Sequence, residues 1–247
     1  MELNHHKLAL AVCMAGLVSC TLPPANQPIP PSSKHVLELP LLPPSPSAQT
    51  APQSLPQTFR INAAASTLHI LVYRGGTLAR LGHNHVISSR NISGSLWRGK
   101  SLQGSGFAIT VPVNALIVDD NDARAAEGED FPLNVTEEAK QGTKTNMLRE
   151  TLLDGAHYPD ISISCVGLQG DSDTPMAVAA LRIKDQTRQV SVPVTVSSVD
   201  GRLHVKGTFD IKQTDFGITP LNVALGALLV LDTIKIKFEL VAEAHEQ

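Results

Sequence analysis

Aromatic side chains are scarce in this chain of 247 residues: they make up 4% of it, and Trp97 is the single tryptophan. Proteins that stack nucleic-acid bases or sugar rings need several such side chains, so their scarcity disfavours both kinds of binding. The net charge is −3, acidic and basic residues are interspersed, and no basic patch or stripe is present. We therefore expect no nucleic-acid partner.

Cysteine is also scarce, with three residues in the chain, and two of them lie in the segment 1–20. That segment is typical of an export signal, because Lys7 is positively charged and the apolar run from Leu8 to Val18 is too short to span a bilayer. It ends in Leu17-Val18-Ser19-Cys20, which resembles the lipobox of bacterial lipoproteins, where the cysteine is acylated and becomes the mature N-terminus. The resemblance implies lipidation at Cys20 and a periplasmic protein anchored to a bacterial membrane, with the outer membrane favoured. The alternative is an ordinary secretion signal with an incidental cysteine.

Loss of Cys13 with the signal and acylation of Cys20 leave Cys165 as the one remaining thiol. A protein with a single leftover cysteine has no intramolecular disulfide. Cys165 continues an alternating run with Ile161 and Ile163, which predicts a small buried hydrophobic side chain. A nucleophilic role would need an activating neighbour, and the sequence shows none.

Residues 21–58 are rich in proline and almost without charge. Such a composition forms extended, semi-rigid chain without a core, so we expect a disordered linker that holds the folded part away from a membrane. A ligand for a proline-reading module is the alternative. The predicted organisation is therefore a signal at 1–20, a linker at 21–58 and one folded domain at 59–247.

The folded part lacks the common catalytic motifs. No Gly-x-Ser-x-Gly elbow, phosphate-cradling loop or His-Glu-x-x-His segment is present. We expect a protein that is not an enzyme.

The segment from Val190 to Val241 predicts three long antiparallel strands. Apolar residues alternate with polar ones along each of them, which places one set on each face of a sheet. Asp200-Gly201 separates the first two runs and is a strong hairpin signal. Further strands are expected at Phe59–Asn62, Ser66–Arg74, Ile87–Trp97, Phe107–Val113, Ile161–Leu168 and Met176–Ile183. Gly94 marks a possible bulge or bend in the third of these.

One helix is expected, over Asn134–Asp154. Thr136 can cap it, Gly155 ends it and Pro159 prevents its continuation. About eight strands with a single helix favour an all-β, antiparallel barrel, because closure removes exposed sheet edges. The helix is expected to cover an end or an edge of this eight-stranded barrel.

Three groups of short motifs, in this order along the chain, resemble the YceI-like family. They are Phe59-Arg60-Ile61-Asn62 with Ser66-Thr67-Leu68; Asn146-Met147-Leu148 through His157-Tyr158-Pro159-Asp160-Ile161; and Thr214-Asp215-Phe216-Gly217-Ile218. The family implies a lipocalin-like barrel that binds polyisoprenoid lipids in an apolar tunnel, and it does not imply catalysis. The chain departs from it at Thr151-Leu152-Leu153, where typical members have paired phenylalanines. Leu81-Gly82-His83-Asn84-His85 is not a general family feature either, so the ligand can differ from a long polyisoprenoid.

The expected function is binding of a hydrophobic ligand for carriage, storage or sensing. Candidate ligands are an isoprenoid quinone, a polyprenyl lipid or a fatty acid, and no cofactor is expected apart from such a lipid. The alternating strand faces supply the tunnel candidates, whose inward direction the pattern leaves open: Ile70, Val72, Ile109, Val111, Val192, Val194, Phe209, Ile211, Ile236 and Phe238. A barrel filled by its own side chains, serving as a non-catalytic interaction module, is one alternative.

His83 and His85 share a face if their segment is extended. We expect them to line the polar mouth of the barrel as hydrogen-bonding groups. The alternative is a site for a metal ion or haem, which would need further ligands such as His69, His157 or Asp215. The acidic run at Asp119, Asp120, Asp122, Glu127, Glu129 and Asp130 lacks calcium-loop spacing, so a solvated loop is expected there.

Overall fold

The structure is a computed structural model, and it describes residues 56–245. The predicted signal, the lipidation at Cys20 and nearly all of the predicted linker lie outside the described residues.

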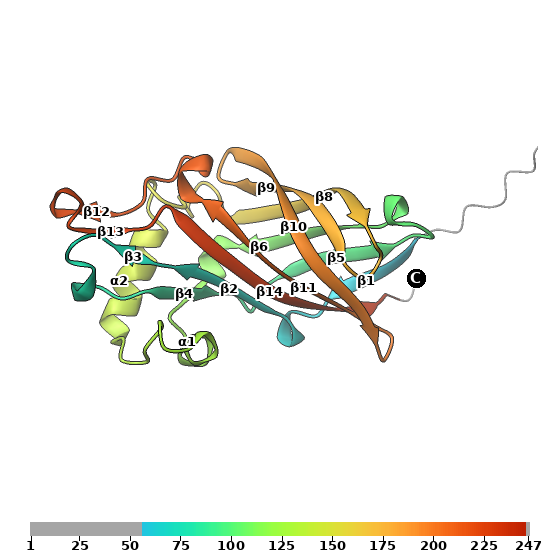
Figure 1. Cartoon of the computed structure of the whole chain (residues 1–247), viewed down its shortest axis with the longest axis horizontal. Coiled ribbons are helices and arrows are strands. Elements are labelled where there is room, and N and C mark those ends of the chain that lie inside the picture. The colour runs from blue at the N-terminus through green and yellow to red at the C-terminus, as the bar shows by residue number, and fades with distance from the viewer. Residues whose placement is uncertain (1–55, 246–247) are drawn as a thin grey trace, which may run out of the picture. The chain divides into compact units, whose positions relative to one another are not determined.

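A closed antiparallel barrel forms the centre of the fold (Figure 1). It is closed because the first strand pairs with the last, with Phe59 opposite Ala244. The prediction of an all-β barrel is confirmed. In the order in which they are hydrogen-bonded, its eight strands are β1 (Gln57–Ile61), β5 (Ser93–Arg98), β6 (Gly106–Pro112), β8 (Asp160–Gly170), β9 (Pro175–Ile183), β10 (Gln186–Val199), β11 (Arg202–Lys212) and β14 (Thr233–Ala244).

The long strand β14 has two partners on one side. Its C-terminal part pairs with β1, and its middle part pairs with β2 (Thr67–Val72). Two further strands continue the wall beyond β2, namely β4 (His85–Ser88) and the short β7 (Ile117–Val118). The predicted strand Ile87–Trp97 is thus two strands, β4 and β5, because the chain leaves the ladder after Ser88 and re-enters it at Ser93.

A separate small sheet includes β3, which directly follows β2, and the sequence pattern did not predict it. Its strands are β12 (Asn222–Val223), β13 (Leu228–Val230) and β3 (Arg74–Gly75). They are two or three residues long, too short for a period of two residues to stand out from the surrounding chain.

Positive backbone φ angles, which favour glycine, are found at the β10–β11 hairpin and at Gly94. Asp200 and Gly201 both have positive φ, 49° and 75°, as the predicted two-residue hairpin between β10 and β11 requires. Gly94 in β5 has φ of 138°, and a Cβ atom there would lie 2.1 Å from the carbonyl oxygen of Ala108. Only glycine allows this close approach of β5 to β6.

Within the described part of the chain, two α-helices accompany the barrel. The predicted helix is α2 (Glu137–Met147), and the Thr136 hydroxyl accepts the predicted capping hydrogen bond from the Ala139 amide at 3.3 Å. It ends earlier than predicted, and the chain from residue 148 to 157 forms successive turns instead. The second helix, α1 (Asn121–Glu127), was not predicted because its acidic sequence has no apolar stripe. Neither helix within residues 56–245 has the length and hydropathy needed to cross a bilayer.

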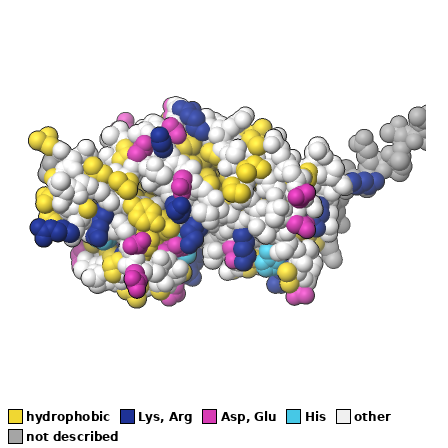
Figure 2. All heavy atoms as spheres, viewed as in Figure 1, with side chains coloured by type: hydrophobic (Ala, Val, Ile, Leu, Met, Phe, Trp, Pro, Cys, Tyr) yellow, Lys and Arg dark blue, Asp and Glu magenta, His cyan; other side chains and the backbone are white. Residues whose placement is uncertain are grey.

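The outer surface carries charges of both signs. Figure 2 shows lysine, arginine, aspartate and glutamate side chains interspersed with apolar ones on this face, without a continuous basic stripe.

Candidate functional site

The inward faces of the strands enclose an apolar cavity of about 550 Å³. Pockets that bind small molecules are typically about 300–1,000 Å³ and mostly apolar, so the interior has the size and chemistry of a ligand site. The predicted tunnel requires empty space inside the barrel, whereas the alternative, a barrel filled by its own side chains, has none. The structure has such a space.

All ten predicted tunnel residues line this cavity. The structure supplies the inward direction that the alternating pattern left open. In each strand, the face that carries these residues is turned toward the interior of the barrel. Whether these side chains contact a ligand stays a prediction. The ten are Ile70, Val72, Ile109, Val111, Val192, Val194, Phe209, Ile211, Ile236 and Phe238.

Two of the residues that line the cavity from β9 have small side chains. Ala177 and Ala179 line the cavity and are almost fully buried, at 3% and 2% exposed. Larger residues there would extend into the cavity. Sequence reasoning missed them because alanine is weakly hydrophobic, although their spacing with Leu181 and Ile183 follows the period of a half-buried strand.

The segment around the end of α2 contributes to the cavity wall. Met147, Leu152 and Leu153 line the cavity, and Leu148 packs on the adjoining core. These apolar side chains at and after the end of α2 therefore serve partly as cavity lining. This agrees with the expectation that the helix covers an end or an edge of the barrel.

Polar lining residues gather at the other end of the barrel. Arg98 pairs with Gln57 at the start of β1, near the end of β14. Beyond Arg98 the chain passes through Lys100 and a short 3₁₀ turn at Leu102–Gly104. The polar residues that line the cavity there are Arg98, Lys100, Ser101, Ser105, Ser172 and Asp173. This end offers hydrogen-bond donors, two cationic side chains and the carboxylate of Asp173. No pattern in the sequence predicted that it would border the cavity.

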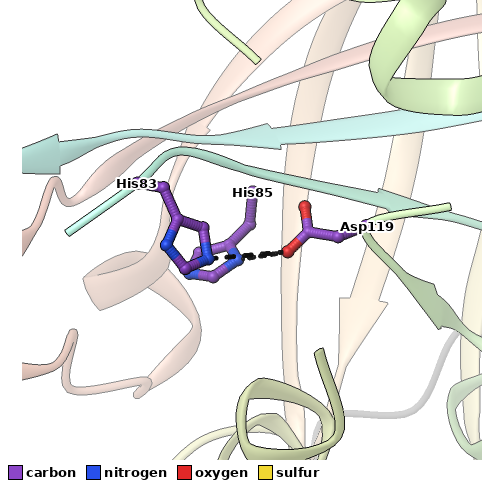
Figure 3. A group of neighbouring side chains, drawn as sticks. All are labelled: His83, His85 and Asp119. Atoms are coloured by element: carbon purple, nitrogen blue, oxygen red, sulfur yellow. Dashed lines mark hydrogen bonds and ion pairs between the residues drawn. The ribbon is translucent and has the colours of Figure 1, made fainter. Parts of the chain in front are cut away.

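His83 and His85 do not line the cavity, so the predicted position at a polar mouth is corrected. His85 is the first residue of β4 and pairs with Val72, at the end of the barrel opposite Arg98. Both imidazoles turn toward Asp119, which follows β7 (Figure 3). His85 Nδ1 lies 2.7 Å and His83 Nε2 lies 3.9 Å from the same oxygen, Asp119 Oδ2.

The surroundings of Asp119 hold its carboxylate in place. Asp119 is fully buried, and its Oδ1 accepts hydrogen bonds from the Val86 amide at 2.9 Å and from Arg124 Nη1 at 2.5 Å. Burial raises the pKa of Asp119, but the hydrogen bond and charge of His85, the Val86 amide and the Arg124 charge outweigh it and hold the pKa below its usual range. The carboxylate is therefore ionised at neutral pH.

His83 is the least satisfied member of this group. Its Nε2 is buried and has no hydrogen-bond partner. Burial, followed by the neighbouring His85, lowers the pKa of His83, so the ring is neutral at neutral pH. The rings of His83 and His85 approach edge to face, with centroids 4.5 Å apart.

The other proposed metal ligands lie elsewhere. Among residues 56–245, the cluster of possible ligands contains His83, His85 and Asp119, and none of the three further residues suggested by the sequence. His69 Nδ1 lies 2.7 Å from Glu127, and His157 Nδ1 lies 2.8 Å from Asp154. Asp215 lies in the 3₁₀ turn Gln213–Phe216 after β11.

The prediction of a solvated acidic loop is wrong in two respects, because Asp122 and Glu127 lie in the helix α1, and the side chains of Asp119 and Glu127 are buried. Asp119 is buried beside Arg124, and the side chain of Glu127 is 5% exposed and bonded to His69 and Lys237. Burial of both acids is possible because each has basic partners, which the local sequence does not reveal. Asp122, Glu129 and Asp130 are exposed, as expected.

Cys165 is half-buried on β8, rather than buried as predicted. The β8–β9 register is regular from Ser162 to Cys165 and shifts directly after it, between Cys165 and Gly167. Burial raises the pKa of the thiol, so the site is not one that activates a nucleophile.

Comparison with known proteins gives a family and a fold. A family model described as YceI-like domain matches residues 59–242. The crystal structure of BcnA from Burkholderia cenocepacia is similar, with a TM-score of 0.54 and 17% identity over 73% of this chain and 98% of that one. The YCEI protein of Campylobacter jejuni aligns with a TM-score of 0.44 and 11% identity, over 65% of this chain and 85% of that one. No curated protein matches the chain.

Proposed function

The chain belongs to the YceI-like family, and we propose that it binds a hydrophobic molecule inside its barrel. The observation that carries this proposal is the apolar cavity of about 550 Å³, which the strands surround with aliphatic side chains. Each Å² of apolar ligand surface removed from water contributes about 25 cal/mol. An isoprenoid quinone, a polyprenyl lipid or a fatty acid would each bury its chain in this interior.

The polar end of the cavity is the proposed place for the ligand's head group. Arg98 and Lys100 can attract an anionic or hydrogen-bond-accepting head, while the hydroxyls of Ser101 and Ser105 lie in the same segment. Polar groups of this kind orient a ligand whose affinity comes from apolar burial.

The proposed setting is the periplasm, with the protein held at a membrane by acylation of Cys20. The support is the lipobox-like end of the first 20 residues. A barrel at a membrane surface would serve carriage, storage or sensing of a lipid, and this task is non-catalytic.

Organic extraction of the purified full chain, followed by mass spectrometry, tests the proposal. We expect one hydrophobic species in stoichiometric amount. In the variant Ala179→Phe the new ring would occupy cavity volume, so the bound amount should fall at least tenfold. The proposal fails if the wild-type protein carries no such species and binds no added quinone, polyprenyl phosphate or fatty acid.

The matched control is Ala180→Phe, one position along the same strand. Ala180 does not line the cavity, so the added ring should leave ligand content unchanged. Equal losses in both variants would show that β9 tolerates no phenylalanine, and that ligand loss reflects disturbed folding.

A further inference from the structure

Three side chains from separate segments bring donor atoms together outside the barrel cavity. His83 precedes β4, His85 begins β4 and Asp119 follows β7. One possible ligand atom from each lies within 4.8 Å of the other two. From this geometry we infer that His83, His85 and Asp119 form a binding site for a divalent transition-metal ion.

The distances suit an ion of this class after a small adjustment. Tetrahedral zinc with bonds of about 2.0–2.2 Å to nitrogen and oxygen places neighbouring ligand atoms about 3.4 Å apart. Asp119 Oδ2 lies 2.7 Å from His85 Nδ1 and 3.9 Å from His83 Nε2, one shorter and one longer than this value. Changes of roughly 0.5–0.7 Å at each contact would admit the ion.

His83 supplies the clearest sign of a missing partner. Buried polar atoms are nearly always hydrogen-bonded, and an exception calls for an explanation such as an ion. His83 Nε2 is such an exception, and the carboxylate oxygen that faces it, Asp119 Oδ2, lies beyond hydrogen-bond distance. A metal ion between the three residues would satisfy it.

The carboxylate is oriented as metal ligands usually are. Arg124 and the Val86 amide hold Asp119 Oδ1, which leaves Oδ2 directed at the imidazoles. Such outer contacts fix a ligand's direction. Arg124 is itself held, donating to the Asn84 carbonyl at 2.7 Å and to the Pro132 carbonyl at 2.8 Å.

The charges select the kind of ion. The single carboxylate is already paired with Arg124, and Arg74 adds a second positive charge near His83. Magnesium and calcium depend on several anionic oxygens and would bind poorly here. Zinc, cobalt, nickel and copper are bound well by imidazole nitrogen, and two imidazoles with one carboxylate suit them.

Cobalt titration tests the site, because tetrahedral Co²⁺ absorbs visible light. The full chain would be purified in detergent without a histidine tag, treated with chelator and titrated with Co²⁺, and then with Zn²⁺ in competition. We expect one ion per chain, unaffected by excess Mg²⁺. His83→Ala should weaken binding at least tenfold. It should change the unfolding midpoint of the metal-free protein little, because His83 Nε2 has no hydrogen bond to lose and only the ring contact with His85 is removed.

His204→Ala is the matched control. The His204 side chain is 26% exposed against 31% for His83, and its Nδ1 also lies 3.9 Å from a carboxylate, that of Glu239. It has no part in the cluster, so this variant should bind Co²⁺ as the wild type does. The inference is overturned if the wild type shows no saturable band, if His83→Ala binds equally well, or if His204→Ala loses binding too.

The lipid content of His83→Ala separates this site from the barrel cavity. Neither imidazole lines the cavity, so extraction should recover the same hydrophobic species from the variant and the wild type. If His83→Ala misfolds, His83→Gln takes its place, and metal-free stability equal to the wild type is required before its Co²⁺ affinity is interpreted.

Discussion

Glu127, the last residue of α1, accepts a hydrogen bond from Lys237 of β14 at 2.7 Å, across 110 positions of sequence. Its other carboxylate oxygen lies 2.7 Å from His69 Nδ1 on β2. The Glu127 side chain is 5% exposed and that of His69 17%, whereas the Lys237 side chain is 43% exposed, so Lys237 reaches the buried carboxylate from the surface. One carboxylate therefore attaches α1 to two neighbouring strands of the barrel wall.

Replacement of this carboxylate should destabilise the fold in a pH-dependent way. Burial raises the pKa of Glu127, but hydrogen bonds from Lys237 and His69 outweigh it and hold the pKa below the usual 4.5. A lowered carboxyl pKa contributes stability above the unfolded value, and this contribution is lost as pH falls through the folded value. We expect Glu127→Gln to cost about 1–2 kcal/mol at pH 7. The difference from the wild type should shrink below about pH 4.5.

Urea unfolding of both proteins at pH 7, 5 and 3.5 measures this difference. Glu129→Gln is the control, because Glu129 is exposed and lies two residues further along the chain. A constant difference across the three pH values would contradict the assigned role of the Glu127 charge.

Two glycines should respond to alanine with opposite signs. In Gly94→Ala the new Cβ would lie 2.1 Å from the Ala108 carbonyl oxygen at φ of 138°, so we expect a loss of at least about 2 kcal/mol. Gly142 lies inside α2, and a Cβ atom added there would meet no atom within 4 Å, so Gly142→Ala should gain about 0.5–1 kcal/mol. Thermal unfolding decides both, and a neutral Gly94→Ala would mean that β5 and β6 do not approach so closely in solution.

The cationic end of the cavity should discriminate between ligand heads. Exposed charge pairs contribute about 0.2–1 kcal/mol each. The double change Arg98→Ala with Lys100→Ala should therefore weaken binding of a fluorescent fatty acid about two- to thirtyfold. Its neutral methyl ester should bind equally to both proteins. The control is Arg60→Ala with Arg182→Ala, which removes the same charge from positions that do not line the cavity. Equal weakening of acid and ester would place the head group elsewhere.

Membrane attachment should depend on Cys20. Cys20→Ser removes the thiol that acylation requires, so the variant should leave the membrane fraction and appear in the soluble extract. Cys13→Ser, within the proposed signal, should stay with membranes. Sedimentation of Cys20→Ser with membranes after a high-salt wash would rule out lipidation at this residue as the anchor.

Local sequence was sufficient for much of the barrel. Alternation with a period of two residues identified the long strands β10, β11 and β14, because side chains on one strand face opposite sides regardless of its partners. The Asp200-Gly201 turn and the Thr136 cap were also predictable, since each depends on the backbone within four residues. The ten tunnel residues followed from the same alternation, apart from the direction of each face.

Closure of the barrel, its open interior and the burial of Asp119 depend on tertiary structure and could not be predicted from the alternation. Pairing of Phe59 with Ala244 closes the barrel, and this contact depends on how all the strands between them twist and tilt. The open interior, with Ala177 and Ala179 in its wall, is a matter of summed side-chain volumes around the wall and not of any single strand. Asp119 is buried against Arg124, five positions further along the chain, and against His85, 34 positions before it. A carboxylate is stable in the interior only beside such partners. The sequence of one segment does not show which residues of a distant segment will lie next to it.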